Sequence, residues 1–105
     1  MGMKITFSFG RNWKNYVRHV VNEKVIEEAK SSLLRYLPEK EWKDKVFIDV
    51  GCGSGLFSLS ALLLGVKQAI SFDLDPNSVE ASHILRDRFN HLLEGKGNWD
   101  IFRGT

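Results

Sequence analysis

Three glycines that alternate with other residues directly after a short apolar run constrain this chain more than any other feature. Residues 46–50 (VFIDV) are β-branched, aromatic or apolar apart from Asp49, which predicts a buried parallel strand. The tight turn Gly51-Cys52-Gly53-Ser54-Gly55 follows, and residues 56–64 (LFSLSALLL) then predict an apolar helix closed by Gly65. A turn between a parallel strand and its helix lies at the ligand-binding edge of an α/β sheet.

A second strand and helix follow at once. Residues 66–72 predict another strand, after which Asp75 as N-cap and Pro76 at the first helical position open a helix that ends near Gly95. Its predicted buried stripe is Val79, Leu85, Phe89 and Leu92. Residues 99–102 predict a third, short strand. This alternation indicates right-handed crossovers and an α/β, Rossmann-like, partial doubly wound parallel sheet with strand order 3-2-1.

The part of the chain before the first strand is predicted to be helical. Apolar residues recur at helical spacing over residues 13–37, and Pro38 ends this run. Residues 1–10 are expected to be an extended lead-in, and Trp42, in a charged connector, is expected to fold back on the core. We therefore divide the chain into an N-terminal helical segment with its connector, residues 1–45, and a βαβαβ half-domain, residues 46–105.

Composition limits the classes of protein that remain. The 105 residues are 43% hydrophobic and 27% charged, which is globular composition. A single cysteine excludes an internal disulfide and a multi-cysteine zinc site, and no metal is required. The net charge of +2 makes nucleic acid an unlikely partner, and the sequence contains no apolar segment long enough for a membrane span or a secretory signal. We expect a soluble, cytoplasmic protein.

The glycine turn lacks the partners that a polyphosphate needs. Leu56 stands where the dinucleotide fingerprint has its third glycine, and no Gly-Lys-Ser/Thr follows as in a P-loop. No lysine or arginine lies between Lys45 and Lys67. Asp73 ends the second strand, 24 residues after Asp49, where a carboxylate can accept hydrogen bonds from both ribose hydroxyls. Two carboxylates around a glycine turn suit a positively charged nucleoside.

These segments resemble the class I S-adenosylmethionine-dependent methyltransferases. Residues 46–59 (VFIDVGCGSGLFSL) resemble their first motif, and residues 70–79 (ISFDLDPNSV) resemble their second. The resemblance implies that Gly51, Gly53 and Gly55 lie under the cofactor, S-adenosylmethionine, whose amino-acid end Asp49 would orient. It also implies that Asp73 holds the ribose and that Leu74 packs on the adenine. The candidate cofactor-binding residues are Asp49, Gly51, Cys52, Gly53, Ser54, Gly55, Asp73 and Leu74.

The resemblance covers the cofactor motifs and no acceptor-facing motif. We therefore expect the S-adenosylmethionine-binding portion of a methyltransferase, inactive alone, with an unidentified methyl acceptor and no identified catalytic residue. The alternatives are an NAD or FAD dinucleotide-binding module and a non-enzymatic interaction fragment. In strand order 3-2-1 the first strand is an apolar sheet edge without proline or lysine, which predicts a homodimer paired through it.

Three other features have simpler interpretations. Cys52 has no histidine nearby in the sequence to activate it and is expected to be a small turn residue. The histidines, His19, His83 and His91, are not paired at metal-ligand spacing. Trp13 and Tyr16 are expected to pack the N-terminal helix rather than cover the cofactor.

Overall fold

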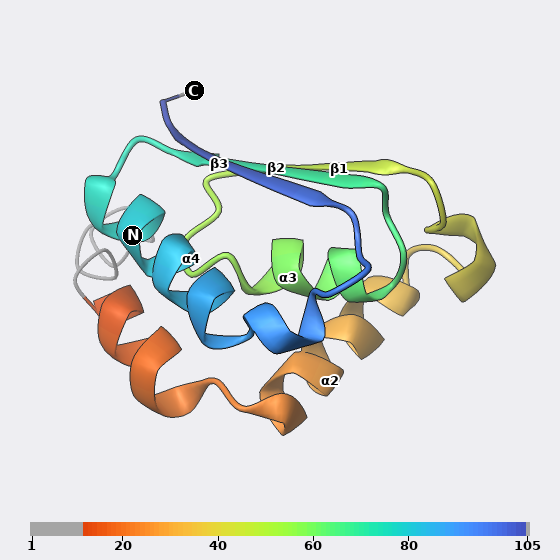
Figure 1. Ribbon diagram of the computed structural model, residues 1–105, viewed down its shortest axis with the longest axis horizontal. Helices are drawn as coiled ribbons and strands as arrows, with labels where there is room; N and C mark the ends of the chain where they lie inside the picture. The colour runs from red at the N-terminus through yellow and green to blue at the C-terminus, as the bar shows by residue number, and fades with distance from the viewer. Residues whose placement is uncertain (1–11, 105) are drawn as a thin grey trace.

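The computed structural model describes residues 12–104 as one packed α/β unit (Figure 1). The helical elements are η1 (Tyr16–Val20), α2 (Glu23–Leu34), η2 (Glu39–Glu41), α3 (Leu56–Leu63), α4 (Pro76–Arg88) and η3 (Asn90–Leu92). The strands are β1 (Val46–Val50), β2 (Gln68–Asp73) and β3 (Asn98–Arg103). The lead-in expected over residues 1–10 lies outside the described residues. Within residues 12–104, no helix is both long and apolar enough to cross a membrane.

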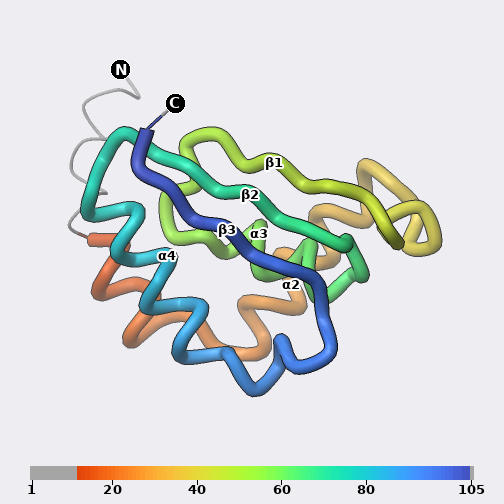
Figure 2. The backbone as a smooth tube through the Cα atoms, turned by 45° about the horizontal axis from the view of Figure 1, so that its top comes forward, coloured from red at the N-terminus to blue at the C-terminus, as the bar shows by residue number. Residues whose placement is uncertain are grey.

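The strands form a parallel sheet with the order β1-β2-β3, which confirms the predicted fold class and strand order (Figure 2). β2 begins two residues later than the predicted strand over residues 66–72. The reason is the end of the preceding helix, where the Val66 N–H donates to the Ala61 carbonyl at 3.3 Å and keeps Val66 in the turn. β3 extends the predicted strand by one residue at each end.

All three α-helices lie on the same side of the sheet (Figure 1). α3 and α4 are the two crossover helices, and α2 packs against α3. This arrangement explains why α3 is apolar almost all round, since it lies between the sheet and α2. Leu59, Ala61 and Leu62 on α3 are fully buried.

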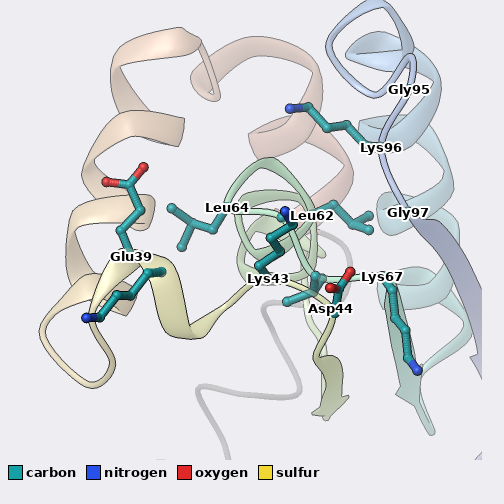
Figure 3. Close-up of a pocket in the computed structure, with 12 residues that line it drawn as sticks. Glu39, Lys43, Asp44, Leu62, Leu64, Lys67, Gly95, Lys96 and Gly97 are labelled. Carbon is teal, nitrogen blue, oxygen red and sulfur yellow. The ribbon is translucent and has the colours of Figure 1, made fainter.

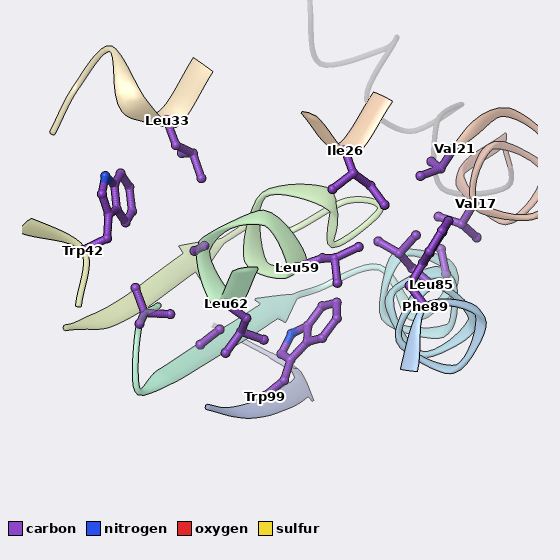
Figure 4. Close-up of a cluster of buried hydrophobic side chains, with 14 residues drawn as sticks. Val17, Val21, Ile26, Leu33, Trp42, Leu59, Leu62, Leu85, Phe89 and Trp99 are labelled. Carbon is purple, nitrogen blue, oxygen red and sulfur yellow. The ribbon is translucent and has the colours of Figure 1, made fainter. Parts of the chain in front are cut away.

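The core fills the space between the sheet and these helices (Figure 4). Trp99 of β3 and Leu59 and Leu62 of α3 occupy its sheet side. Trp42 is 7% exposed and its Nε1–H donates to the Leu37 carbonyl at 2.8 Å, which confirms that the connector folds back. Burying apolar surface at about 25 cal/mol per Å² is the main stabilisation available to a chain of this size.

The prediction of one continuous helix over residues 13–37 is wrong, because the chain leaves the helix at Val21. Val21 is extended, and Asn22 caps α2 by accepting a backbone N–H bond at 2.9 Å. The Arg88 guanidinium, at the end of α4, donates to the carbonyl of Val17 at 2.9 Å and to that of Val21. The apolar spacing continues through this break, so periodicity could not reveal it. α2 also ends at Leu34, three residues earlier than predicted.

The second crossover helix is shorter than predicted and buries smaller residues. α4 ends at Arg88 and a 3-10 turn follows, because Phe89 has φ −110° and ψ 22°, outside the α region. Leu85 and Phe89 of the predicted stripe are buried, whereas Val79 and Leu92 are only half-buried. The buried residues of α4 also include small ones, Ser78, Ala81 and Ser82, which permit close packing against its neighbours.

β1 is not buried on both faces as predicted. Val46, Ile48 and Val50 are 44%, 59% and 71% exposed. Side chains alternate along a strand, so these three share one face of the sheet, while the α-helices lie on the other side (Figure 1). Phe47 and Asp49, on the helix-covered face, are half-buried. β1 is also an edge of the sheet, so one row of its backbone N–H and C=O groups has no strand beside it among residues 12–104.

We propose that two copies of the chain pair through this β1 edge. An apolar edge strand with unpaired backbone groups recruits another strand unless a charge or proline blocks it. Light scattering is expected to give twice the monomer mass at high protein concentration, and hydrogen exchange at the β1 amides is expected to slow as the concentration rises. A monomer whose β1 amides exchange at a concentration-independent rate would contradict the pairing. Ile48→Lys, which places a charge on the edge, is the disrupting variant.

Candidate functional site

The glycine turn after β1 has a backbone that only glycine adopts readily. Gly51, Gly53 and Gly55 have φ of +70°, +58° and +83°. A Cβ on Gly55 would lie 2.8 Å from the Ser82 Oγ, so α4 already packs against this glycine. At Gly51, by contrast, no described atom lies within 4 Å of the Cβ position. The turn is therefore packed at its helix end and open at its strand end, where a ligand can approach the backbone.

Asp73 joins the glycine turn to the end of β2. Its Oδ2 accepts the Gly53 N–H at 3.1 Å, and its Oδ1 accepts the Asp75 N–H at 2.9 Å. The N–H groups of Gly51 and Cys52 both donate to the carbonyl oxygen of the residue directly before Asp73, at 2.8 and 3.1 Å. A carboxylate oxygen accepts more than one hydrogen bond, so Asp73 can still accept from two hydroxyl groups.

Asp49 lies near Asp73 and is half-buried. Burial raises the pKa of the Asp49 carboxyl above its ordinary value, and the charge of Asp73 raises this pKa further. The Ser58 hydroxyl opposes this effect by donating to the Asp49 Oδ2 at 2.9 Å. The ion pairs within residues 12–104 are Lys14–Glu80 and Lys30–Glu27, so neither Asp49 nor Asp73 has a basic partner there. This uncompensated negative charge favours a cationic ligand.

The other candidate residues lie on or beside the turn. Burial raises the pKa of the Cys52 thiol to about 11, so the thiol stays neutral and is a poor nucleophile near neutral pH. Ser54 is buried, and its Oγ accepts the Leu56 N–H at 3.2 Å at the start of α3. Leu74 is 66% exposed next to Asp73 and presents a free apolar surface. The structure thus brings all eight predicted residues to one edge of the sheet.

Trp13 and Tyr16 pack against the core as expected, but the structure also places Trp13 against the glycine turn, which the sequence prediction did not favour. The Trp13 indole lies against Gly53, with its Cε2 atom 3.1 Å from the Cβ position of that glycine. Trp13 also makes an edge contact with Tyr16, at 5.4 Å between ring centroids. No spacing in the sequence links Trp13 to the turn, because the two are brought together only by the packing of the N-terminal helix. The buried serines Ser58 and Ser71 were missed for the same reason.

A cavity of about 610 Å³ lies at the other end of the strands, next to the residues that precede each strand (Figure 3). Lys43, Lys67 and Lys96 line it together with Glu39 and Asp44, so its charges are mixed. Parallel α/β sheets bind ligands at the carboxyl ends of their strands, which is the edge with the glycine turn. The turn is therefore the better candidate for the functional site.

Comparisons with known proteins point to methyltransferases. The family model described as ribosomal protein L11 methyltransferase (PrmA) matches residues 28–93, which include the glycine turn and Asp73. A ribosomal protein L11 methyltransferase of a Psychrobacter species is 46% identical over 63 residues, which are 58% of this chain and 20% of that protein. The chain spans about a fifth of the length of the curated relatives it matches.

Solved structures of methyltransferases share the fold. A Pyrococcus horikoshii protein described as an RNA methyltransferase is 33% identical with a TM-score of 0.52, over 70% of this chain and 34% of that one. A Haemonchus contortus phosphoethanolamine N-methyltransferase, in complex with phosphoethanolamine and S-adenosylhomocysteine, has a TM-score of 0.54 at 19% identity. This match covers 95% of the present chain and 21% of the Haemonchus enzyme, and it shows likeness of fold alone.

Proposed function

The chain belongs to the ribosomal protein L11 methyltransferase (PrmA) family, and from this premise we propose that its glycine turn binds S-adenosylmethionine and the product S-adenosylhomocysteine. The observation that supports this most is the pair of carboxylates, Asp49 and Asp73, at the open end of the turn without a basic partner among the described residues. S-adenosylmethionine carries a sulfonium and an ammonium group, so its charge fits this site. A pyrophosphate would be repelled by the same carboxylates.

Each candidate residue then has a defined part in binding. Asp49 accepts a hydrogen bond from the ammonium group of the cofactor. Asp73 accepts hydrogen bonds from the two ribose hydroxyls while it keeps its hydrogen bond from the Gly53 N–H. Leu74 offers its exposed apolar side chain to the adenine. The open backbone at Gly51 admits the ligand, and the remaining turn residues, Cys52, Ser54 and Gly55, keep the turn in shape.

The chemistry itself belongs to the cofactor. A sulfonium already carries a good leaving group, so methyl transfer needs alignment of donor and acceptor more than it needs acid or base catalysis. The residues of this chain would bind and orient the donor. The proposal assigns none of these residues to the methyl acceptor.

A direct comparison of ligands tests the proposed function. Isothermal titration of the chain with S-adenosylhomocysteine is expected to show saturable binding, with NAD binding at least tenfold more weakly. NAD carries a pyrophosphate, which the two carboxylates and the absence of a lysine or arginine between Lys45 and Lys67 disfavour. Tighter binding of NAD would favour the dinucleotide module, and no binding of either ligand would favour a non-enzymatic interaction fragment.

We expect no methyl transfer by the 105-residue chain alone. The chain matches about a fifth of the length of its relatives, and every site residue proposed above is assigned to the donor and none to the acceptor. The assay uses labelled S-adenosylmethionine with ribosomal protein L11, the acceptor in the family name, and measures label in the protein fraction. Label that depends on the chain and disappears in Asp49→Ala would contradict this expectation.

A further inference from the structure

Four side chains from four different elements form a buried chain of hydrogen bonds that ends on Asp49. The Trp99 Nε1–H of β3 donates to the Ser71 Oγ of β2 at 2.9 Å. The Ser71 and Ser58 hydroxyls lie 2.5 Å apart, and the Ser58 Oγ of α3 donates to the Asp49 Oδ2 of β1 at 2.9 Å. Ser58 and Ser71 are both fully buried.

Counting the available hydrogen atoms shows that the hydrogen bonds in this series all run in one direction, from donor to acceptor toward Asp49. A serine hydroxyl has a single hydrogen to donate, and Ser58 uses its hydrogen toward Asp49. The hydrogen between the two serines must therefore come from Ser71, whose own Oγ accepts the indole hydrogen of Trp99. Every donor in the series is thus used, and the series ends on the carboxylate that the proposed function places at the cofactor.

We propose that Ser58, oriented by Ser71 and Trp99, is a positioning residue that holds the Asp49 carboxylate toward the amino-acid end of S-adenosylmethionine. This inference rests on the proposed function, and it adds three residues to the site that no sequence motif assigned. The Ser58 bond occupies one side of the Asp49 Oδ2 and leaves the remaining lone pairs of the carboxylate free for a ligand. A fully buried partner has no rotational freedom to lose on ligand binding, so the carboxylate is oriented before the cofactor arrives.

Measuring the affinity for two different ligands distinguishes a positioning role of Ser58 from a role in the stability of the fold. S-adenosylhomocysteine has an amino-acid end, whereas 5′-methylthioadenosine has the same adenosine and lacks that end. Ser58→Ala is expected to weaken the binding of S-adenosylhomocysteine by about tenfold and the binding of methylthioadenosine by less than twofold. A variant that only loosened the fold would weaken both ligands equally.

Ser60→Ala is the matched control, because Ser60 lies on the same helix and is equally buried. Its hydroxyl donates to the Leu56 carbonyl at 2.8 Å and does not contact Asp49. This control is expected to bind both ligands as the wild type does. Ser71→Ala, the second test variant, is expected to show the same selective loss as Ser58→Ala to a smaller extent. Equal losses for both ligands, or no loss in either test variant, would overturn the inference.

A measurement without ligand keeps this inference separate from the proposed function. Carbon-detected NMR titration follows the Asp49 carboxyl, whose charged neighbour is Asp73 and whose nearby thiol is Cys52. Loss of the Ser58 donor is expected to raise the Asp49 pKa in Ser58→Ala and to leave it unchanged in Ser60→Ala. An unchanged titration in Ser58→Ala would refute the positioning role. A shifted titration in a chain that binds no S-adenosylhomocysteine would refute the proposed function alone.

Discussion

Asp73→Ala is expected to weaken S-adenosylhomocysteine binding by about tenfold to a hundredfold, since a charge-assisted hydrogen bond contributes about 1.5–3 kcal/mol. The same change is expected to lower the free energy of unfolding by about 1–3 kcal/mol. The reason is that the N–H groups of Gly53 and Asp75 both lose the Asp73 carboxylate as their acceptor. Isothermal titration measures the first effect, and urea unfolding followed by tryptophan fluorescence measures the second.

Asp75→Ala separates the two effects of the Asp73 change. The Asp75 side chain caps α4 by accepting the Asn77 N–H at 2.9 Å, and it has no assigned contact with the ribose. Loss of this cap is expected to cost about 1 kcal/mol of stability with little change in ligand affinity. If Asp73→Ala bound S-adenosylhomocysteine as well as Asp75→Ala did, the ribose would lie elsewhere.

Asp49→Asn is expected to abolish most binding of S-adenosylhomocysteine and, at neutral pH, to make the unliganded fold more stable. Burial raises the Asp49 pKa, so the ionised carboxylate is less favourable in the folded protein than in the unfolded chain. A group with a raised folded pKa stabilises the fold at low pH, and that contribution is lost as the pH rises through the folded pKa. Asparagine has no charge to bury, and its Oδ1 still accepts the Ser58 hydroxyl hydrogen.

Thermal unfolding of the wild type and of Asp49→Asn, measured across a range of pH, tests whether the substitution stabilises the fold. The melting temperature of Asp49→Asn is expected to exceed that of the wild type at pH 7, with the difference disappearing below about pH 3, where Asp49 is protonated in both states. A lower melting temperature for Asp49→Asn than for the wild type at pH 7 would contradict this expectation.

Local patterns in the sequence predicted most of the elements and their order. The β-branched run of β1, the glycine turn and the Asp75–Pro76 helix start each depend on neighbouring residues alone, so they could be recognised without a structure. The carboxylates after β1 and β2 were brought to one edge because parallel strands end together. The predicted site therefore rested on topology as well as on motif.

Long-range contacts account for what the sequence could not show. The helix break at Val21 is stabilised by Arg88, which is 67 residues away along the chain. The exposure of Ile48 follows from both crossover helices lying on one face of the sheet. Ser58 and Ser71 resemble any other small buried residues in the sequence, and only the packing of α3 on the sheet joins them to Asp49.

Amide chemical-shift mapping with S-adenosylhomocysteine tests most directly whether the glycine turn is the cofactor site. Nitrogen-15 spectra of the chain are recorded as the ligand is added, and the same titration with Asp73→Ala serves as the control. The largest shifts are expected at residues 49–55 and 73–75, with the residues around Lys43 and Lys67, at the far edge of the sheet, unchanged. Shifts confined to that far edge, or spectra that do not change at saturating ligand, would contradict the placement of the cofactor at the turn.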